Sequence, residues 1–364
     1  MAEADDELTD TIREARRARK KSKKAKPEWY ELLTSDLWGL LGTDPKADAS
    51  GVLTEIAEVL GVTDAVNLYD LRTHAGTLGK LPYDVAAKYG DELDRRWKDL
   101  VPNEVHVFLD QFFGALKKKK ADEWERALED TRDQSSPMLT NVLGMVKQIL
   151  PAFCRAFTRE DNPLKNCQSL ETDYLQTYIH PIFREACHRF GKTVWQSGEI
   201  STKYFVDRQK ADGVAIVPSR DNFPVAYFEG AKPVSRHSKR TADMEKTMQN
   251  VVSIQYHTIK ELLSSRRRVP AMLQTFGAQS INLEIVCCLL EYHEGNLFLH
   301  EVDRANVPAQ AEDVELFPEF YTCIMGWTVS IRFYMRGVNN EKNQTVIDKP
   351  HGGPLGECKN NQAS

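Results

Sequence analysis

The order of helical and strand-like segments after residue 165 is the feature that most limits the fold of this 364-residue chain. Apolar residues recur at helical spacing through residues 170–190. Two short apolar segments follow at 213–217 and 224–229, with Pro, Ser, Arg, Asp and Asn between them. Two apolar segments joined by such turn residues are typical of a β-hairpin. A second helical pattern then covers residues 241–263.

The rest of this part of the chain completes the same pattern. Short apolar segments at residues 271–276, 283–292 and 297–302 predict further strands, and aromatic residues from Phe320 to Tyr334 mark a closing helix. Helices and strands that alternate in this way build an α/β or α+β domain. We therefore expect such a domain over residues 166–338.

The preceding part of the chain is helical in pattern and carries no recognisable catalytic, metal or phosphate-loop motif. We interpret residues 28–165 as a helical region. The helices expected there cover residues 28–41, 91–100, 105–117 and 138–157.

Both ends of the chain are too polar to bury a core. Residues 1–10 carry five acidic residues, and residues 11–26 carry nine basic residues and one acidic residue. We predict that residues 1–27 form a disordered arm and residues 339–364 a disordered tail. The basic run is typical of a nuclear-localisation or nucleic-acid-binding arm, with a solubilising tail as the alternative. The formal net charge of −5 excludes a uniformly basic, histone-like binder.

The chain shows neither an uninterrupted apolar run of about 18 residues nor an apolar signal-peptide core. Its seven cysteines include no C-x-x-C pair, which argues against a cysteine zinc site and a disulfide framework. Cys287 and Cys288 lie in an apolar run and are expected to be small core residues. We expect a reducing compartment, the nucleus or the cytoplasm, and no membrane partner.

One group of residues in the hairpin has the composition of a catalytic site. Asp212 stands at the start of the first hairpin strand, and Glu229 and Lys232 stand at the end of the second. A hairpin brings these two ends side by side, and paired carboxylates suit Mg²⁺ or Mn²⁺. A nearby lysine can orient a water molecule or help to deprotonate it, so the group is suited to hydrolysis of a phosphodiester.

This arrangement resembles the signature of the PD-(D/E)XK, or restriction-endonuclease-like, nuclease superfamily. The resemblance rests on Lys210-Ala211-Asp212-Gly213 and Glu229-Gly230-Ala231-Lys232. It implies an αβββαβ core, which is similar to the order over residues 166–305, and related modules occur in many fungal proteins and in Crinkler-type proteins. It also implies a further glutamate from the preceding helix, Glu171 or Glu185, of which we favour Glu171 as a third metal ligand.

The spacing between acid and lysine departs from the family pattern. The family separates them by one residue, whereas two residues separate Glu229 from Lys232. In a regular strand these two side chains would point to opposite faces of the sheet. We therefore predict a β-bulge at Gly230, which would return them to a common face.

Basic residues flank the second predicted helix. They are Arg236, Lys239 and Arg240 before it and Arg266, Arg267 and Arg268 after it. They are candidates for contacts to the phosphates of a nucleic acid, and charged residues at a solvated helix boundary are the alternative. The sequence predicts a metal-dependent nuclease, or a nuclease-like protein, acting on DNA or RNA. The alternative is a catalytically inactive relative that binds nucleic acid or acts as an effector-like protein-interaction module.

Overall fold

A computed structural model describes most of the chain from residue 81 to residue 340. The described ranges are 81–97, 100–131, 136–166, 168–235, 237–265, 273–293 and 296–340, together with residues 55–56, 58–59 and 66–67. The predicted arm over residues 1–27, the predicted helix over residues 28–41 and residues 341–364 of the predicted tail lie outside the described residues. The first two residues of that tail, 339 and 340, are instead the end of a helix, Phe317–Asn340.

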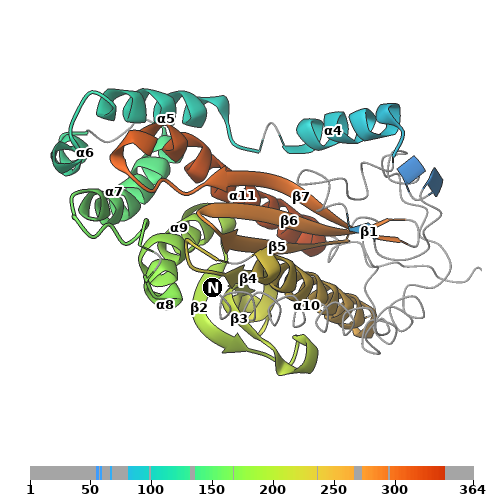
Figure 1. Ribbon diagram of the computed structural model, residues 1–364. Coiled ribbons are helices and arrows are strands. Elements are labelled where there is room, and N and C mark those ends of the chain that lie inside the picture. Colours follow the sequence, from blue (N-terminus) through green and yellow to red (C-terminus); the bar gives the residue numbers. More distant parts are fainter. Residues whose placement is uncertain are drawn as a thin grey trace, which may run out of the picture.

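A seven-stranded mixed sheet forms the centre of the structure, with the strand order β1-β7-β6-β5-β4-β3-β2 (Figure 1). Strands β2, β3 and β4 form an antiparallel meander, β4 pairs with β5 in parallel, and β5, β6 and β7 are again antiparallel. The strands are β1 (Val66–Asn67), β2 (Val194–Ser201), β3 (Lys210–Val217), β4 (Phe223–Gly230), β5 (Leu273–Ile281), β6 (Glu284–His293) and β7 (Asn296–Asn306). The expected mixture of helices with a sheet, of α/β or α+β class, is confirmed.

Helices cover both faces of this sheet. They are α4 (Tyr83–Trp97), α5 (Asn103–Leu116), α6 (Trp124–Glu129), α7 (Pro137–Phe157), α8 (Glu171–Tyr174), α9 (His180–Ala186), α10 (His237–Ser264) and α11 (Phe317–Asn340). A π-helical turn, Leu175–Ile179, joins α8 to α9, and a second, Cys187–Gly191, extends α9, so one helical segment covers the range predicted as a single helix.

Two neighbouring residues of β5 show how the layers are arranged. A side chain at Gly277 would meet Thr247 and Val251 of α10, so this face of the sheet is closed by α10. The ring of Phe276 lies 6.3 Å from that of Trp327 in α11. Since successive side chains of a strand point to opposite faces, α10 and α11 lie on opposite sides of the sheet.

The N-terminal helices pack on the α11 side. Phe113 of α5 stacks on Phe317 at 4.9 Å between ring centroids, and Phe153 of α7 meets the same ring at 5.2 Å. One buried apolar cluster runs from Val101 to Met335. Residues 101–164 of the predicted helical region therefore share a core with the sheet, and the domain boundary at residue 165 stays a prediction. Cys287 and Cys288 are fully buried in this core, as expected.

Strand β2 was not predicted, because residues 194–201 are mostly polar. It is the edge strand of the sheet, so its polar side chains reach solvent while Trp195 is buried against Phe183, with 4.8 Å between the stacked rings. The helix predicted over residues 91–100 begins too late in the sequence, because α4 begins at Tyr83. Among the described residues, none of the helices is both long enough and apolar enough to cross a membrane.

Candidate functional site

Asp212 and Glu229 lie on neighbouring antiparallel strands at the same end of the hairpin. Gly213 of β3 pairs with Phe228 of β4, and the next step of this register sets Asp212 opposite Glu229. The backbone N–H of Gly230 donates a hydrogen bond to Oδ2 of Asp212 at 2.8 Å. The structure therefore brings the two predicted carboxylates together through the hairpin.

The glycines that follow these acids are required by packing on the opposite face of the sheet. A Cβ atom at Gly213 would lie 2.3 Å from the indole ring of Trp195. A Cβ atom at Gly230 would lie 2.5 Å from Leu175. The Asp-Gly and Glu-Gly pairs thus place a carboxylate on the α10 side and leave room for a large side chain on the other side.

The carboxylate of Glu229 is almost completely buried, with 4% of the residue exposed. Its Oε1 atom accepts a hydrogen bond of 2.6 Å from the hydroxyl of Tyr227 and lies 2.8 Å from Nζ of Lys246. Burial, and next the negative charge of Asp212, raise the pKa of Glu229 to about 7, although Lys246 and Tyr227 act in the opposite direction. A carboxylate in these surroundings changes its charge near neutral pH.

Helix α10 adds three charged side chains at helical spacing, Lys239, Asp243 and Lys246. Residues three and four apart lie on one face of a helix, so all three point to the same side. Lys239 Nζ lies 2.5 Å from Oε2 of Glu171 at the start of α8. Burial raises the pKa of Asp243 to about 6, and the charges of Glu171 and Asp212 act in the same direction. The Oδ2 atom of Asp243 is buried and has no hydrogen-bond partner among the described residues.

We call these six residues the acid–lysine cluster: Glu171, Asp212, Glu229 and Asp243 with Lys239 and Lys246. The pKa of Asp212 is also raised, first by burial and further by the charge of Glu171. Four carboxylates and two ammonium groups leave a formal excess of two negative charges. The raised pKa values of the three central acids are the physical consequence of packing like charges away from water.

The predicted β-bulge at Gly230 is wrong. Strands β4 and β5 pair in regular register up to Gly230 and Ser280, and the N–H of Ala231 donates to the carbonyl of Ser280 at 2.7 Å. Lys232 lies two residues beyond the end of β4. The ammonium group that contacts Glu229 belongs to Lys246, which lies on α10 rather than on the strand.

The other predicted site residues lie outside the acid–lysine cluster or outside the described residues. Glu185 pairs with Arg189 of its own helical segment at 2.8 Å, so of the two glutamates considered only Glu171 belongs to the acid–lysine cluster. Arg240 pairs with Glu284 of β6 at 3.0 Å. Arg236, Arg266, Arg267 and Arg268 lie outside the described residues.

Asp243 and Lys246 were missed by sequence reasoning. Their signal was present, because positions 243 and 246 lie three residues apart on the helix predicted over residues 241–263, and Lys239 just before it continues this charged stripe. Nothing in the local pattern indicates that this stripe faces the hairpin, since a charged helical face is usually solvated.

Carboxylate oxygens are the ligands that Mg²⁺ and Mn²⁺ prefer, so the donor chemistry of the acid–lysine cluster fits such an ion. In the part of the chain that the structure describes, however, no group of three or more His, Cys, Asp or Glu side chains is arranged so that it could hold a metal ion. Two of the four carboxylates are instead paired with ammonium groups. Comparisons of the chain with protein-family models, with curated proteins and with solved structures found no match.

Proposed function

We propose that this protein is a metal-dependent phosphodiesterase that hydrolyses DNA or RNA, and that Asp212, Glu229 and Glu171 would come together on Mg²⁺ or Mn²⁺ when the ion binds. The observation that carries the proposal is the acid–lysine cluster itself. Its formal excess of two negative charges lies at the end of two central strands, beside the buried carboxylate of Glu229, and a divalent cation would neutralise it.

The order of the elements around the cluster supports the same proposal. A helical segment, the antiparallel strands β2, β3 and β4, helix α10 and the parallel strand β5 follow one another along the chain. This order is similar to the αβββαβ core of the PD-(D/E)XK superfamily. The first strand, β2, supplies the element that the sequence prediction lacked.

Each residue of the cluster has a role in this proposal. When bound, a divalent cation lowers the pKa of water and offsets the charge that develops on the phosphate. Lys246, which contacts Glu229 at 2.8 Å, takes the role that the resemblance gives to Lys232, namely to hold the attacking water or a phosphate oxygen beside the carboxylates. Lys239 positions Glu171 through their ion pair.

A second candidate function follows from the burial of Glu229. Its carboxylate is already satisfied by Tyr227 and Lys246, and only 4% of the residue is exposed. A protein that kept the nuclease fold without its activity would have such a site, in which its own side chains pair the buried carboxylate. It would act as a nucleic-acid-binding or effector-like protein-interaction module, and the basic residues 11–26 support nucleic acid as the partner. For both candidates we propose the nucleus or the cytoplasm as the compartment.

Cleavage of plasmid DNA, single-stranded DNA and RNA by the full chain in Mg²⁺ or Mn²⁺ tests the proposal. We expect Asp212→Asn and Lys246→Met to lower the rate about a hundredfold or more, because each removes a group from the charge-stabilising site. Lys232→Met and the control Lys118→Met, which changes an exposed lysine after α5, should leave the rate within about twofold.

The second candidate predicts a different set of results. A wild-type protein that binds the same nucleic acids without cleaving them in either metal would reject the enzyme and favour the binding module. Cleavage that depends on Lys232 and not on Lys246 would retain the enzyme and reject our assignment of the lysine. Calorimetric titration with Mn²⁺ adds a readout without activity, and Asp212→Asn should abolish the binding that it detects.

A further inference from the structure

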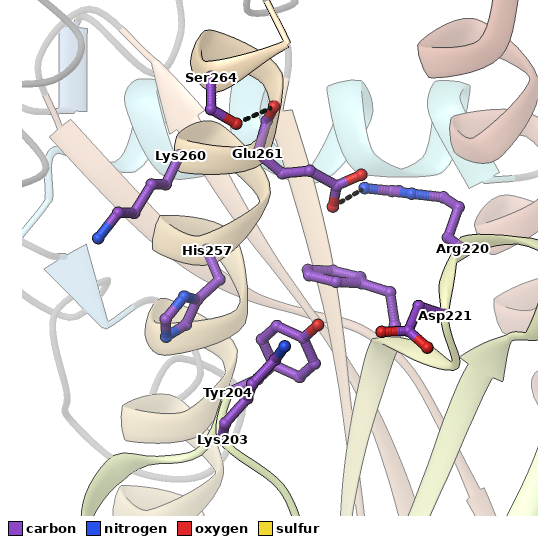
Figure 2. A pocket seen from close by; sticks show the side chains of 9 residues that line it. Lys203, Tyr204, Arg220, Asp221, His257, Lys260, Glu261 and Ser264 are labelled. Atoms are coloured by element: carbon purple, nitrogen blue, oxygen red, sulfur yellow. Dashed lines mark hydrogen bonds and ion pairs between the residues drawn. The ribbon is translucent and has the colours of Figure 1, made fainter.

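A second site lies at the other end of the same hairpin. An open pocket of about 550 Å³ is lined by residues of the β2–β3 connection, the β3–β4 turn and the C-terminal half of α10 (Figure 2). Phe223, which lines the pocket, is six residues before Glu229 on β4 and therefore about 20 Å from it along the strand. The pocket is thus separate from the acid–lysine cluster, and its volume is in the range of small-molecule sites.

Three basic side chains border one side of the pocket: Lys203, His257 and Lys260. Figure 2 shows His257 and Lys260 projecting from neighbouring turns of α10, and Lys203 beside Tyr204. The Nζ atom of Lys203 lies 5.1 Å from the centre of the Tyr204 ring, and that of Lys260 lies 5.8 Å from the centre of the Tyr256 ring. No described carboxylate forms an ion pair with either lysine, and the ring nitrogens of His257 make no hydrogen bond to a described residue. Burial lowers the pKa of His257, and the charges of Lys260 and Lys203 lower it further. This side of the pocket therefore has positive charge without a matching anion.

Aromatic rings form the wall next to these basic groups. The ring of Tyr204 is partly exposed, and its centroid lies 4.7 Å from that of Phe223 and 5.4 Å from that of His257. The guanidinium group of Arg220 lies 4.7 Å from the centre of the Phe223 ring and pairs with Glu261 at 2.7 Å. These contacts hold the aromatic wall in place, so its position does not depend on a bound ligand.

The opposite rim carries an acid. Asp221 and Asn222, the last two residues of the connection between Val217 and Phe223, have positive φ values of 52° and 54°. Asp221 is exposed and lines the pocket on the side away from α10 (Figure 2). A ligand with an anion at one end, a flat ring in the middle and hydrogen-bond donors at the other end matches this order of groups.

We propose that this pocket binds a nucleoside phosphate, as a free mononucleotide or as one nucleotide of a strand. The phosphate lies among Lys203, His257 and Lys260, where charge-assisted hydrogen bonds are available. The base stacks on Tyr204, since every base presents a π-face to an aromatic ring, and the exposed ammonium group of Lys203 moves from that ring to the phosphate. Asp221 accepts a hydrogen bond from an amino group of the base. This inference is independent of any cleavage at the acid–lysine cluster.

Isothermal titration of the full chain with adenosine 5′-monophosphate, in EDTA, tests the inference. We expect Lys260→Gln to weaken binding at least about tenfold, since it removes a charged hydrogen-bond donor. Tyr204→Ala should weaken binding about fivefold or more, whereas Tyr204→Phe keeps the ring and should bind as the wild type does. Lys118→Gln is the matched control for an exposed lysine, and Lys246→Gln is the control for the acid–lysine cluster. Neither should change the affinity.

Competing ligands separate the possible occupants. Adenosine and inorganic phosphate should each bind at least about tenfold more weakly than the mononucleotide, because each occupies half of the site. A short single-stranded oligonucleotide that displaces the mononucleotide would identify a strand as the source, and failure to displace it would identify the free nucleotide. Equal affinity for inorganic phosphate, tighter binding of phosphotyrosine, or undetectable mononucleotide binding at millimolar concentration would overturn the inference.

Discussion

Replacing Glu229 with glutamine should flatten the dependence of folding stability on pH. The carboxyl group of Glu229 has a pKa of about 7 in the folded protein, mainly because of its burial and next because of Asp212, against the ordinary value of 4.5. Between these two pH values the folded protein holds a proton that the unfolded chain has already released. The free energy of unfolding therefore falls as the pH rises through this window.

The size of this effect follows from the two pKa values. A difference of this size corresponds to about 3 kcal/mol of stability that is present below pH 4.5 and is lost by about pH 7. Glutamine has the shape of the protonated acid and cannot ionise. Its carbonyl oxygen can still accept hydrogen bonds from Tyr227 and Lys246, so the variant removes the titration and retains the contacts.

Urea unfolding of the full chain at several pH values between 4.5 and 8, in EDTA, measures the effect. Relative to the wild type, Glu229→Gln should lose about 3 kcal/mol less stability across this range. Glu245→Gln is the matched control, because Glu245 lies exposed on α10 next to Lys246. If the wild type and Glu229→Gln lose stability in parallel, the raised pKa and the burial on which it rests are refuted.

Two further substitutions test the packing around the site and at α4. Gly213→Ala should destabilise the protein by about 1–3 kcal/mol in urea unfolding, because its methyl group would lie 2.3 Å from the ring of Trp195, and unchanged stability would contradict this packing. Arg96→Met should cost about 3–5 kcal/mol, since Arg96 lies 2.9 Å from the fully buried carboxylate of Glu291. The exposed Arg95→Met is its control, and equal losses for the two variants would show that the buried pair has no special role.

The sequence predicted that Asp212 and Glu229 lie at the same end of a hairpin, because two apolar segments separated by turn residues form a hairpin. It did not predict their register. Ile216 pairs with Pro224 but Ala215 pairs with Ala226, and this shift of one residue in β4 sets Asp212 opposite Glu229. The requirement for Gly213 could not be predicted in the same way, because its reason is the indole ring of Trp195 on β2. That strand has few apolar residues, since an edge strand needs only one buried side, and its pattern therefore resembles a loop.

The lysine that contacts Glu229 could not be predicted from the sequence either. Lys232 is close to Glu229 in the sequence, and only a bulge at Gly230 would have given it a common face with that acid. The regular register between β4 and β5 leaves no bulge there. Lys246 reaches Glu229 instead, because α10 packs on the same face of β4 as this acid, and that packing is decided by apolar contacts elsewhere along the helix.

The sequence by itself determined the mixed class of the fold, the hairpin and the proximity of its two carboxylates. These features depend on periodicity and turn residues, which act over a few positions. Only the tertiary structure decided that Lys246 and Asp243 join the acids, that Glu229 is buried, and that a pocket with basic and aromatic groups lies at the far end of the hairpin. Helix α10 contributes to all three, and the face that a helix turns toward a sheet depends on the packing of the whole core.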